Sequence, residues 1–225
     1  MLRNPLLISA EGSTPCFLPP EMADDMGLVA VGGELSPTWL LEAYRRGIFP
    51  MYAEDEPLLW WSPNPRAVLP LDGMHVARRL RRTIRSGKFR LTLDRAFADV
   101  IRGCADRPTG EGNWLTPDMI RAYEMLHRLG FAHSVEVWHG DELGGGVYGV
   151  AIGGLFAAES MFTRVRDGSK VALAHLVGHL RRRGYGLLDV QFINDHTARL
   201  GAVEIPRREY LKRLREALRQ NAMFA

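Results

Sequence analysis

Three strand-like segments follow one another in the second half of the chain, and they constrain the fold more than any other feature of the sequence. Residues 132–138, 143–150 and 155–162 are rich in apolar side chains, with a turn at residues 139–142 and a Gly-Gly pair at residues 153–154. Connections this short join strands that are neighbours in an antiparallel sheet. The sequence therefore predicts an antiparallel run at the centre of the fold.

Helical patterns lie on both sides of this run. Ser36-Pro37 opens one helix, because Ser suits the capping position and Pro the first helical position, and Gly47 ends it. Thr116-Pro117 opens a helix that runs to Leu129. Helices before and after a central antiparallel run indicate an α+β or α/β mixed sheet. Other predicted helices cover residues 75–86, 97–102, 170–183 and 207–220, and further strands cover residues 89–93 and 187–192.

The first 65 residues differ from the rest in being rich in Pro, Gly and Trp. A length of 225 residues permits one large domain, or a medium domain with a small one. The prolines between residues 49 and 66 stand where they would interrupt a regular helix or strand, so this stretch is predicted to be an ordered loop with an aromatic surface. We therefore expect a small N-terminal domain over residues 1–65 and a larger domain over residues 66–225.

The composition is that of an ordinary globular protein, with 46% hydrophobic residues and a formal net charge of +3. No stretch approaches the roughly 20 apolar residues of a membrane helix. The apolar run Leu6-Leu7-Ile8 is too short for a signal peptide. Cys16 and Cys104 follow no metal or disulfide spacing, so the cytoplasm is the expected location.

Four segments carry motifs in a fixed order across nearly the whole chain. They are GLVAVGGELS at residues 27–36 continuing to YRRGIFP at 44–50, WWSPNPR at 60–66, ESMFTR at 159–164 with SKVAL at 169–173, and DVQ at 189–191 with HTARLGA at 196–202 and IPR at 205–207. Together they resemble the leucyl/phenylalanyl-tRNA–protein transferase family.

The resemblance implies a small N-terminal domain joined to a C-terminal domain of the N-acetyltransferase-like (GNAT) fold. It implies transfer of leucine or phenylalanine, and less well methionine, from aminoacyl-tRNA to the N-terminal Arg or Lys of an acceptor protein. That transfer marks the acceptor for degradation under the N-end rule. Because the donor ester is already activated, the reaction demands no metal and no cofactor. A monomer is the default expectation.

Asp189 and Gln191 are the candidate catalytic pair, at the two positions where the resemblance implies one. They are two residues apart on a predicted strand, so they point to the same face. The Gln191 carbonyl oxygen can accept a hydrogen bond from the attacking amine. Asp189 can orient Gln191 and favour the positive charge that develops on nitrogen. The alternative is that the two residues close a strand end by binding backbone amides.

Glu159 is a carboxylate in a largely apolar strand, where an unpaired charge is costly to bury. Two interpretations stay open. Family membership favours a Glu159 that holds the α-amino group of the donor amino acid or the positive end of the acceptor. Alternatively, Glu159 pairs with a structural arginine such as Arg164.

Selection of Leu and Phe requires an apolar pocket that discriminates by little more than size. Leu173, Leu176 and Leu180 have helical spacing, however, and are equally typical of plain core. The substrate-binding candidates that the resemblance implies are Glu159, Ser160, Val147, Phe156, Leu173, Leu176, Leu180 and Leu188.

Trp114, Trp60 and Trp61 are candidates for stacking on the terminal adenosine of the donor. One residue of the Trp60-Trp61 pair can instead cement the two domains. Members of the family usually carry Trp where this chain has Met51, which offers only apolar contact. Val190, where Cys is frequent in relatives, is expected to face away from the catalytic pair.

An RNA donor carries one phosphate per nucleotide and therefore requires a basic surface. The densest basic cluster of this chain contains no acidic residue, although a basic run is often only a solvated helix face. The tRNA-binding candidates are Arg78, Arg79, Arg81, Arg82, Arg85 and Lys88, with Arg90 beside them.

A CoA-dependent N-acyltransferase of the same fold is the alternative function, and an RNA-binding module without catalysis is a third. Residues 181–186 match the R-x-x-G-x-G pattern that holds the CoA pyrophosphate in related acetyltransferases. This stretch is predicted to close a helix, whereas a phosphate loop opens one, so a helix cap explains it better. His175 and His179 lie four apart but lack the Glu of H-E-x-x-H and a third ligand, and they predict no metal site.

Overall fold

The computed structural model describes residues 6–8, 14–106 and 114–225, and their strands form two sheets that follow each other along the chain. The first sheet has the order β1-β2-β4-β3, with β1 at Leu6–Ile8, β2 at Leu28–Gly32, β3 at Phe49–Pro50 and β4 at Leu59–Trp61. The second has the order β11-β5-β10-β9-β8-β7-β6, with β5 at Arg66–Val68, β6 at Arg90–Leu93, β7 at Ala132–His139, β8 at Glu142–Ile152, β9 at Leu155–Thr163, β10 at Leu187–Gln191 and β11 at Val203–Ile205.

Strands β7, β8 and β9 form the antiparallel run that the sequence predicts, and each pairs with the next along most of its length, with one register shift in each pairing. Gly149 of β8 approaches β9 so closely that a Cβ there would lie 2.2 Å from the Ala157 carbonyl oxygen, so the pairing requires glycine. β10 then adds to β9 in parallel and to β5 in antiparallel orientation. The sheet is therefore mixed, and the predicted α+β class is confirmed.

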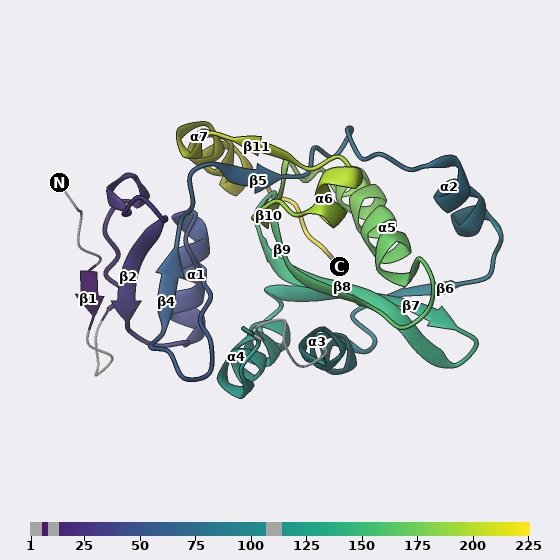
Figure 1. Ribbon diagram of the computed structural model, residues 1–225, viewed down its shortest axis with the longest axis horizontal. Helices are drawn as coiled ribbons and strands as arrows, with labels where there is room; N and C mark the ends of the chain where they lie inside the picture. The colour runs from purple at the N-terminus through teal and green to yellow at the C-terminus, as the bar shows by residue number, and fades with distance from the viewer. Residues whose placement is uncertain (1–5, 9–13, 107–113) are drawn as a thin grey trace.

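Helices cover both faces of the second sheet. α5 (Gly168–Arg182) lies on one face, with α3 (Phe97–Ala105) and α4 (Pro117–Arg128) on the other, as Figure 1 shows. The Thr116 side chain accepts a hydrogen bond from the Met119 N–H and caps α4 as predicted. At the end of α5 the chain turns through Gly184 at φ 77°, and the Tyr185 N–H donates to the Leu180 carbonyl. Residues 181–186 are thus a helix cap, as the sequence indicates.

α1 (Pro37–Arg45) belongs to the first sheet's half of the molecule and stops before Gly47, as predicted. Ser36 occupies the capping position, but its side chain makes no capping hydrogen bond, and its Oγ finds no partner within the described part of the chain. The loop predicted at residues 49–66 is wrong in part, because β3 and β4 lie within it and pair with each other. Strand geometry there buries Trp60 in the core while Trp61 stays half-buried.

Short elements with distant partners are the ones that the sequence patterns do not reveal. β5 pairs with both β10 and β11, although both lie far along the chain. A three-residue strand has too few positions to show alternation. The remaining elements are a 3₁₀ turn η1 (Pro20–Met22), α2 (Arg78–Arg85), α6 (Asp195–Arg199) and α7 (Arg207–Leu218). None of the helices described here combines the length and the apolar character needed to cross a membrane.

Candidate active site

The candidate active site lies where β9 and β10 stop pairing. Their parallel register ends at the pair Asp189 and Ala157. Glu159 is the extra residue of an irregularity between β9 and β8, and a second irregularity separates Asp189 from Gln191 where β10 faces β5. Gln191 itself has φ 57°, in the left-handed region. Irregularities of this kind re-aim side chains and are common beside active sites.

The Asp189 carboxylate is fully buried and accepts hydrogen bonds from three residues. Arg66 of β5 donates from Nε at 2.9 Å and from Nη2 at 2.6 Å. The Tyr210 hydroxyl of α7 donates at 2.8 Å, and the Gln191 backbone N–H at 3.0 Å. Burial alone lowers the pKa of Arg66, but the Asp189 charge more than offsets this, so the pKa of Arg66 rises. The pair is held as a buried ion pair with its hydrogen-bonding groups satisfied.

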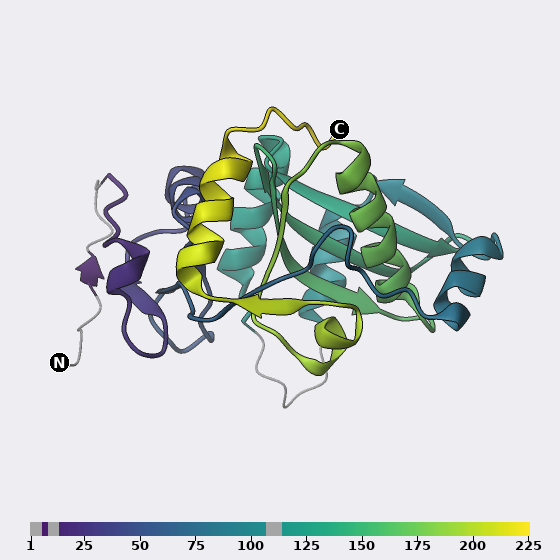
Figure 2. The same cartoon turned by 90° about the horizontal axis from the view of Figure 1, so that it is seen from above.

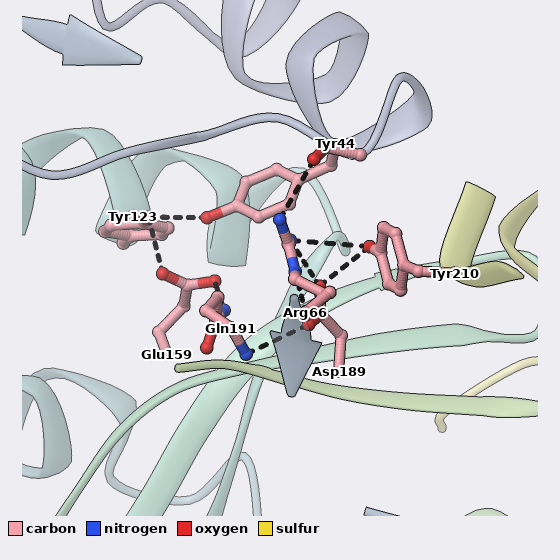
Figure 3. Close-up of polar contacts among 8 residues, drawn as sticks. Tyr44, Arg66, Tyr123, Glu159, Asp189, Gln191 and Tyr210 are labelled. Carbon is pink, nitrogen blue, oxygen red and sulfur yellow. Dashed lines mark hydrogen bonds and ion pairs between the residues drawn. The ribbon is translucent and has the colours of Figure 1, made fainter. Parts of the chain in front are cut away.

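Glu159 and Gln191 form the second half of the site. Gln191 Nε2 donates to Glu159 Oε1 at 2.9 Å, and the Tyr123 hydroxyl of α4 donates to Oε2 at 3.0 Å. The Tyr123 hydroxyl lies 2.6 Å from the Tyr44 hydroxyl of α1. Figure 3 shows this chain of groups beside the ion pair of Arg66 and Asp189. The Gln191 amide and the Tyr123 hydroxyl that bind Glu159 are both neutral groups.

The alternative partner of Glu159, Arg164, lies elsewhere. Its Nη2 is 3.9 Å from Asp106, and its guanidinium carbon lies over the Phe162 ring. The ion pair between Glu159 and Arg164, which the alternative interpretation requires, is not formed, because Arg164 extends from the connection after β9, where it is exposed.

Burial raises the pKa of Glu159 to about 8, and the nearby Asp189 charge adds to this rise. Hydrogen bonds from Tyr44 and Tyr123 and the charge of Arg66 act in the opposite direction. Burial also raises the pKa of both tyrosines well above its usual value, so their hydroxyls stay protonated and able to donate. A carboxyl group that titrates near pH 8 can take up or release a proton close to neutral pH.

The predicted catalytic pair is adjacent, but its two side chains have different partners. Asp189 binds Arg66 and Tyr210, whereas the Gln191 side chain binds Glu159. Asp189 reaches Gln191 through the backbone N–H, which fixes the position of the residue. Val190 packs in the apolar cluster of α5, away from the pair, as expected. The site thus combines an amide, a carboxyl group that titrates near neutrality and a fixed buried charge pair.

The predicted pocket residues belong to one closed cluster between the sheet and α5. The Phe156 ring lies 5.5 Å from the ring of Phe224 in the C-terminal tail. Ser160 is buried on β9, directly after Glu159. Six of the predicted pocket residues are exposed by 1% or less: Val147, Phe156, Leu173, Leu176, Leu180 and Leu188.

The three tryptophans predicted to stack on the adenosine differ in how far their side chains are exposed. Trp60 is fully buried, donates from Nε1 to the Gly32 carbonyl at 2.8 Å and packs its ring 4.9 Å from that of Phe17. Its role is packing, and it offers no free face to a base. Trp61 and Trp114 are half-buried, and Trp61 donates from Nε1 to the Met51 carbonyl at 2.7 Å.

α2 presents the predicted tRNA-binding arginines to solvent and buries Leu80 against the rest of the molecule. Its position at the end of the molecule opposite α1 is visible in Figure 1. Lys88 follows the helix and is exposed, and the Arg90 guanidinium lies 4.9 Å over the Trp138 ring. One cavity of about 530 Å³ is lined by Arg78, Arg81, Arg82 and Arg85.

The two histidines of α5 lie in packed environments, with His175 half-buried and His179 buried. His179 Nε2 lies 2.7 Å from the Phe224 carbonyl oxygen. Burial lowers the pKa of both His175 and His179. Over the residues that the structure describes, no group of His, Cys, Asp and Glu has the geometry to hold a metal ion.

Four residues of the site were missed by sequence reasoning: Arg66, Tyr44, Tyr123 and Tyr210. Arg66 closes the WWSPNPR motif, but a buried and an exposed arginine look alike in a sequence. The available signal was Asp189, since a carboxylate on an apolar strand needs a cation or several donors. The tyrosines carry no such signal, because a buried tyrosine is ordinary core.

Two sequence models of one family match the chain. The Leucyl/phenylalanyl-tRNA protein transferase model matches residues 68–215, and the model of its N-terminal domain matches residues 33–64. These matches define the chain as an aminoacyltransferase that acts with tRNA. The relative named Leucyl/phenylalanyl-tRNA--protein transferase from Anaeromyxobacter sp. (strain Fw109-5) is 55% identical over 204 residues, 90% of this chain and 87% of that protein. The protein of the same name from Magnetococcus marinus is 53% identical over 209 residues, 91% of this chain and 89% of that one.

The chain belongs to the leucyl/phenylalanyl-tRNA–protein transferase family, as its motifs predict. A solved structure, the ribosomal-protein-alanine N-acetyltransferase from Brucella melitensis biovar Abortus 2308, is similar over 45% of this chain and 77% of its own. That alignment has 18% sequence identity and a TM-score of 0.34.

Proposed function

We propose that this chain transfers leucine or phenylalanine, and less well methionine, from aminoacyl-tRNA to a protein whose N-terminus is Arg or Lys. The product carries a new peptide bond and is marked for degradation under the N-end rule. One observation supports this most: Asp189, Gln191 and Glu159 gather at the point where β9 and β10 separate, within a chain that matches the family over nearly its full length. We also propose a cytoplasmic monomer whose domains meet at residues 65 and 66.

The reaction is attack of an α-amino group on an ester carbonyl. The ester is already activated, so the demands on the protein are position and a neutral amine. A free α-amino group has a pKa of about 7.7–8.0, so near pH 7 only a minority is nucleophilic. Bringing two substrates into near-attack geometry supplies roughly 7–11 kcal/mol. Positioning of the substrates therefore accounts for most of the rate acceleration, and removal of the amine proton accounts for the remainder.

Gln191 positions the amine. Its Nε2 is committed to Glu159, which leaves the amide oxygen to accept a hydrogen bond from the attacking nitrogen. The left-handed backbone of Gln191 and the bond from its N–H to Asp189 hold the residue in place. Asp189 favours the positive charge that grows on nitrogen as the bond forms.

Glu159 binds the attacking α-amino group and takes its proton as the new C–N bond forms. That proton then passes to the ribose oxygen of the tRNA, which leaves as the ester C–O bond breaks. The Glu159 pKa of about 8 lies close to that of the amine, so the proton passes between them at little cost. An ammonium group next to the carboxylate also favours the ionised form of Glu159. We assign the leucyl or phenylalanyl side chain to the apolar cluster around Phe156, which lies three residues before Glu159 on β9. We assign the terminal adenosine to Trp61 and Trp114.

The test is transfer of labelled leucine from charged tRNA to a peptide that begins with Arg. Wild type should transfer, and Gln191→Ala should lower kcat/KM by about 100-fold, the usual cost of one preorganised polar group. Gln220→Ala is the matched control, because it makes the same change at an exposed position.

The same assay separates the competing functions. A CoA-dependent N-acyltransferase would acylate the peptide from acyl-CoA and ignore charged tRNA. An RNA-binding module would bind tRNA and transfer nothing. Either result for the wild type removes the proposed function.

A further inference from the structure

A cavity of about 550 Å³ lies past the carboxyl ends of both β9 and β10, outside the catalytic cluster. Arg79 of α2 lines one side of it. Arg166 and Lys170 come from the connection after β9 and the start of α5, and His196 and Arg199 come from α6, after β10. Three segments that are far apart in the sequence therefore contribute basic side chains to one hollow.

The charge of this cavity is strongly positive. Asp167 is the acidic residue in its lining, and its carboxylate lies 3.9 Å from Arg79 and 3.8 Å from Lys170. One carboxylate against two cations leaves a positive charge. Arg166 adds another, since none of the described carboxylates lies within ion-pair distance of it. Arg199 pairs at 3.7 Å with Asp195, but both side chains are exposed, so that contact is weak.

Two further features of the cavity suit an anion. His196 Nε2 is buried and has no hydrogen-bond partner among the described residues, although buried polar nitrogens are normally paired. α5 begins at the cavity wall after the short connection that follows β9, and the N-terminal end of a helix carries partial positive charge. The Asp167 side chain makes no capping hydrogen bond there. Burial and the charges of Lys170 and Arg199 lower the pKa of His196, a shift that a bound anion would reverse.

The position of the cavity relates it to the donor. Thr163 lines the cavity and lies four residues beyond Glu159 on β9, a distance of about 13 Å along a strand. A few nucleotides of single-stranded RNA span this distance. α2 contributes Arg79 to the cavity and its other arginines to the neighbouring hollow, so the basic surface continues outward from it.

We propose that this cavity is a phosphate-binding site that holds a backbone phosphate of the single-stranded 3′ end of the donor tRNA. Arg166 and Lys170 supply the charge, the start of α5 supplies backbone N–H groups, and His196 supplies a further ring nitrogen. The proposal rests on the proposed function, which makes aminoacyl-tRNA the donor. The pyrophosphate of CoA has the same chemistry and is the other source that the test has to separate.

The decisive variant is Arg166→Gln combined with Lys170→Gln. We expect uncharged leucine tRNA to bind about tenfold more weakly, the usual effect of removing one charged hydrogen bond. The slope of log K against log salt should become shallower by about 0.7 for each single-strand phosphate that the protein no longer neutralises. The effect should vanish with the same tRNA shortened by its single-stranded 3′ end. In the wild type, NMR should show the pKa of His196 rising when intact tRNA binds.

The control is Lys212→Gln combined with Arg215→Gln, which removes the same charge from exposed positions on α7. Figures 1 and 2 show α7 well away from α2. The control should keep the wild-type slope at the salt concentrations used, and thermal unfolding should show both variants folded. Lys170→Arg, which keeps the charge, should retain tight binding.

Three results would overturn the proposal. In the first, Arg166→Gln/Lys170→Gln binds intact tRNA with the wild-type affinity and slope while the wild type still transfers leucine, so the function stands and the site does not. In the second, the variant loses equal affinity for intact and shortened tRNA, which places the contact elsewhere on the RNA. In the third, CoA binds the wild type but not the variant, and tRNA binding is unchanged, which assigns the cavity to CoA.

Discussion

Arg66 is a single residue on which the order of the site depends. Its guanidinium binds Asp189 through two nitrogens, donates to the Gly47 carbonyl at 3.1 Å and lies against the rings of Phe49 and Tyr210. It is 1% exposed. Removing one member of a buried ion pair leaves the other charge without compensation in a medium of low polarity.

We expect Arg66→Met to lower the free energy of unfolding by about 3–5 kcal/mol, because Asp189 is then buried unpaired. Urea unfolding measures this. Arg46→Met is the matched control: Arg46 pairs with Glu42 at the surface, where such a pair is worth about 1 kcal/mol or less. Equal losses in the two variants would contradict the role of Arg66.

Glu159 makes the free energy of unfolding depend on pH. Its pKa is about 8 in the folded state against 4.5 for an ordinary glutamate, so the folded state binds the proton more tightly. The stability that this supplies is fully present below about pH 4.5 and is lost as the pH rises through about 8. Glu159→Gln cannot titrate and should remove this loss.

The measurement is the urea midpoint of wild type and Glu159→Gln at pH 5 and pH 9. The urea midpoint of Glu159→Gln, measured relative to that of the wild type, should be higher at pH 9 than at pH 5. Glu142→Gln makes the same change on an exposed side chain, and its midpoint should follow that of the wild type. A constant difference between wild type and Glu159→Gln at the two pH values would show that Glu159 titrates normally.

At the scale of elements, the close approach of β8 and β9 sets the position of Glu159. The register shift next to Gly149 places Glu159 outside the regular pairing. A Cβ on Gly149 would lie 2.2 Å from the Ala157 carbonyl oxygen and 2.5 Å from the Phe156 ring. The strands would have to separate to admit it.

We expect Gly149→Ala to destabilise the fold by about 1–3 kcal/mol, the usual cost of overpacking, and to lower activity through displacement of Glu159. Gly178→Ala is the control, since that glycine lies inside α5 and its new methyl would meet only the end of the Arg182 side chain at 3.4 Å. The control should gain up to about 1 kcal/mol from helix propensity. Thermal unfolding and leucine transfer measure both effects, and a neutral Gly149→Ala would refute the argument.

At the scale of the whole molecule, the two sheets share one core. A single apolar cluster contains Trp39 and Trp60 from the first sheet's half and Phe97 and Tyr123 from the helices beneath the second. The hydroxyls of Tyr44 and Tyr123 meet across this boundary, and the Arg207 side chain donates to the Ser62 carbonyl at 2.6 Å. The active site draws groups from both halves.

The two halves should therefore unfold together. In a Trp114→Phe/Trp138→Phe variant, the remaining tryptophans all lie in the first half. We expect the tryptophan fluorescence of this variant and its far-UV circular dichroism to give the same urea midpoint. Tyr44→Phe in the same background removes one hydroxyl from the boundary and should shift both signals equally. Two separate midpoints in the Trp114→Phe/Trp138→Phe variant would show that the halves are independent.

The sequence by itself determined the elements whose pattern is local. The antiparallel run β7 to β9 follows from short connections, α4 from Thr116-Pro117, and the end of α5 from Gly184. It also determined the family, because the order of the four motifs along the chain can be recognised without knowing which residues are in contact. Asp189 and Gln191 were marked as a pair by the same motifs.

Only the tertiary structure decided which groups face each other. Arg66 reaches Asp189 because β5 pairs with β10, and Glu159 meets Gln191 because β9 and β10 stop pairing just before them. It also showed that Trp60 is core, although its neighbour Trp61 has the same chemistry. Burial and partnership arise from contacts between residues far apart in the chain, and no local pattern records those contacts.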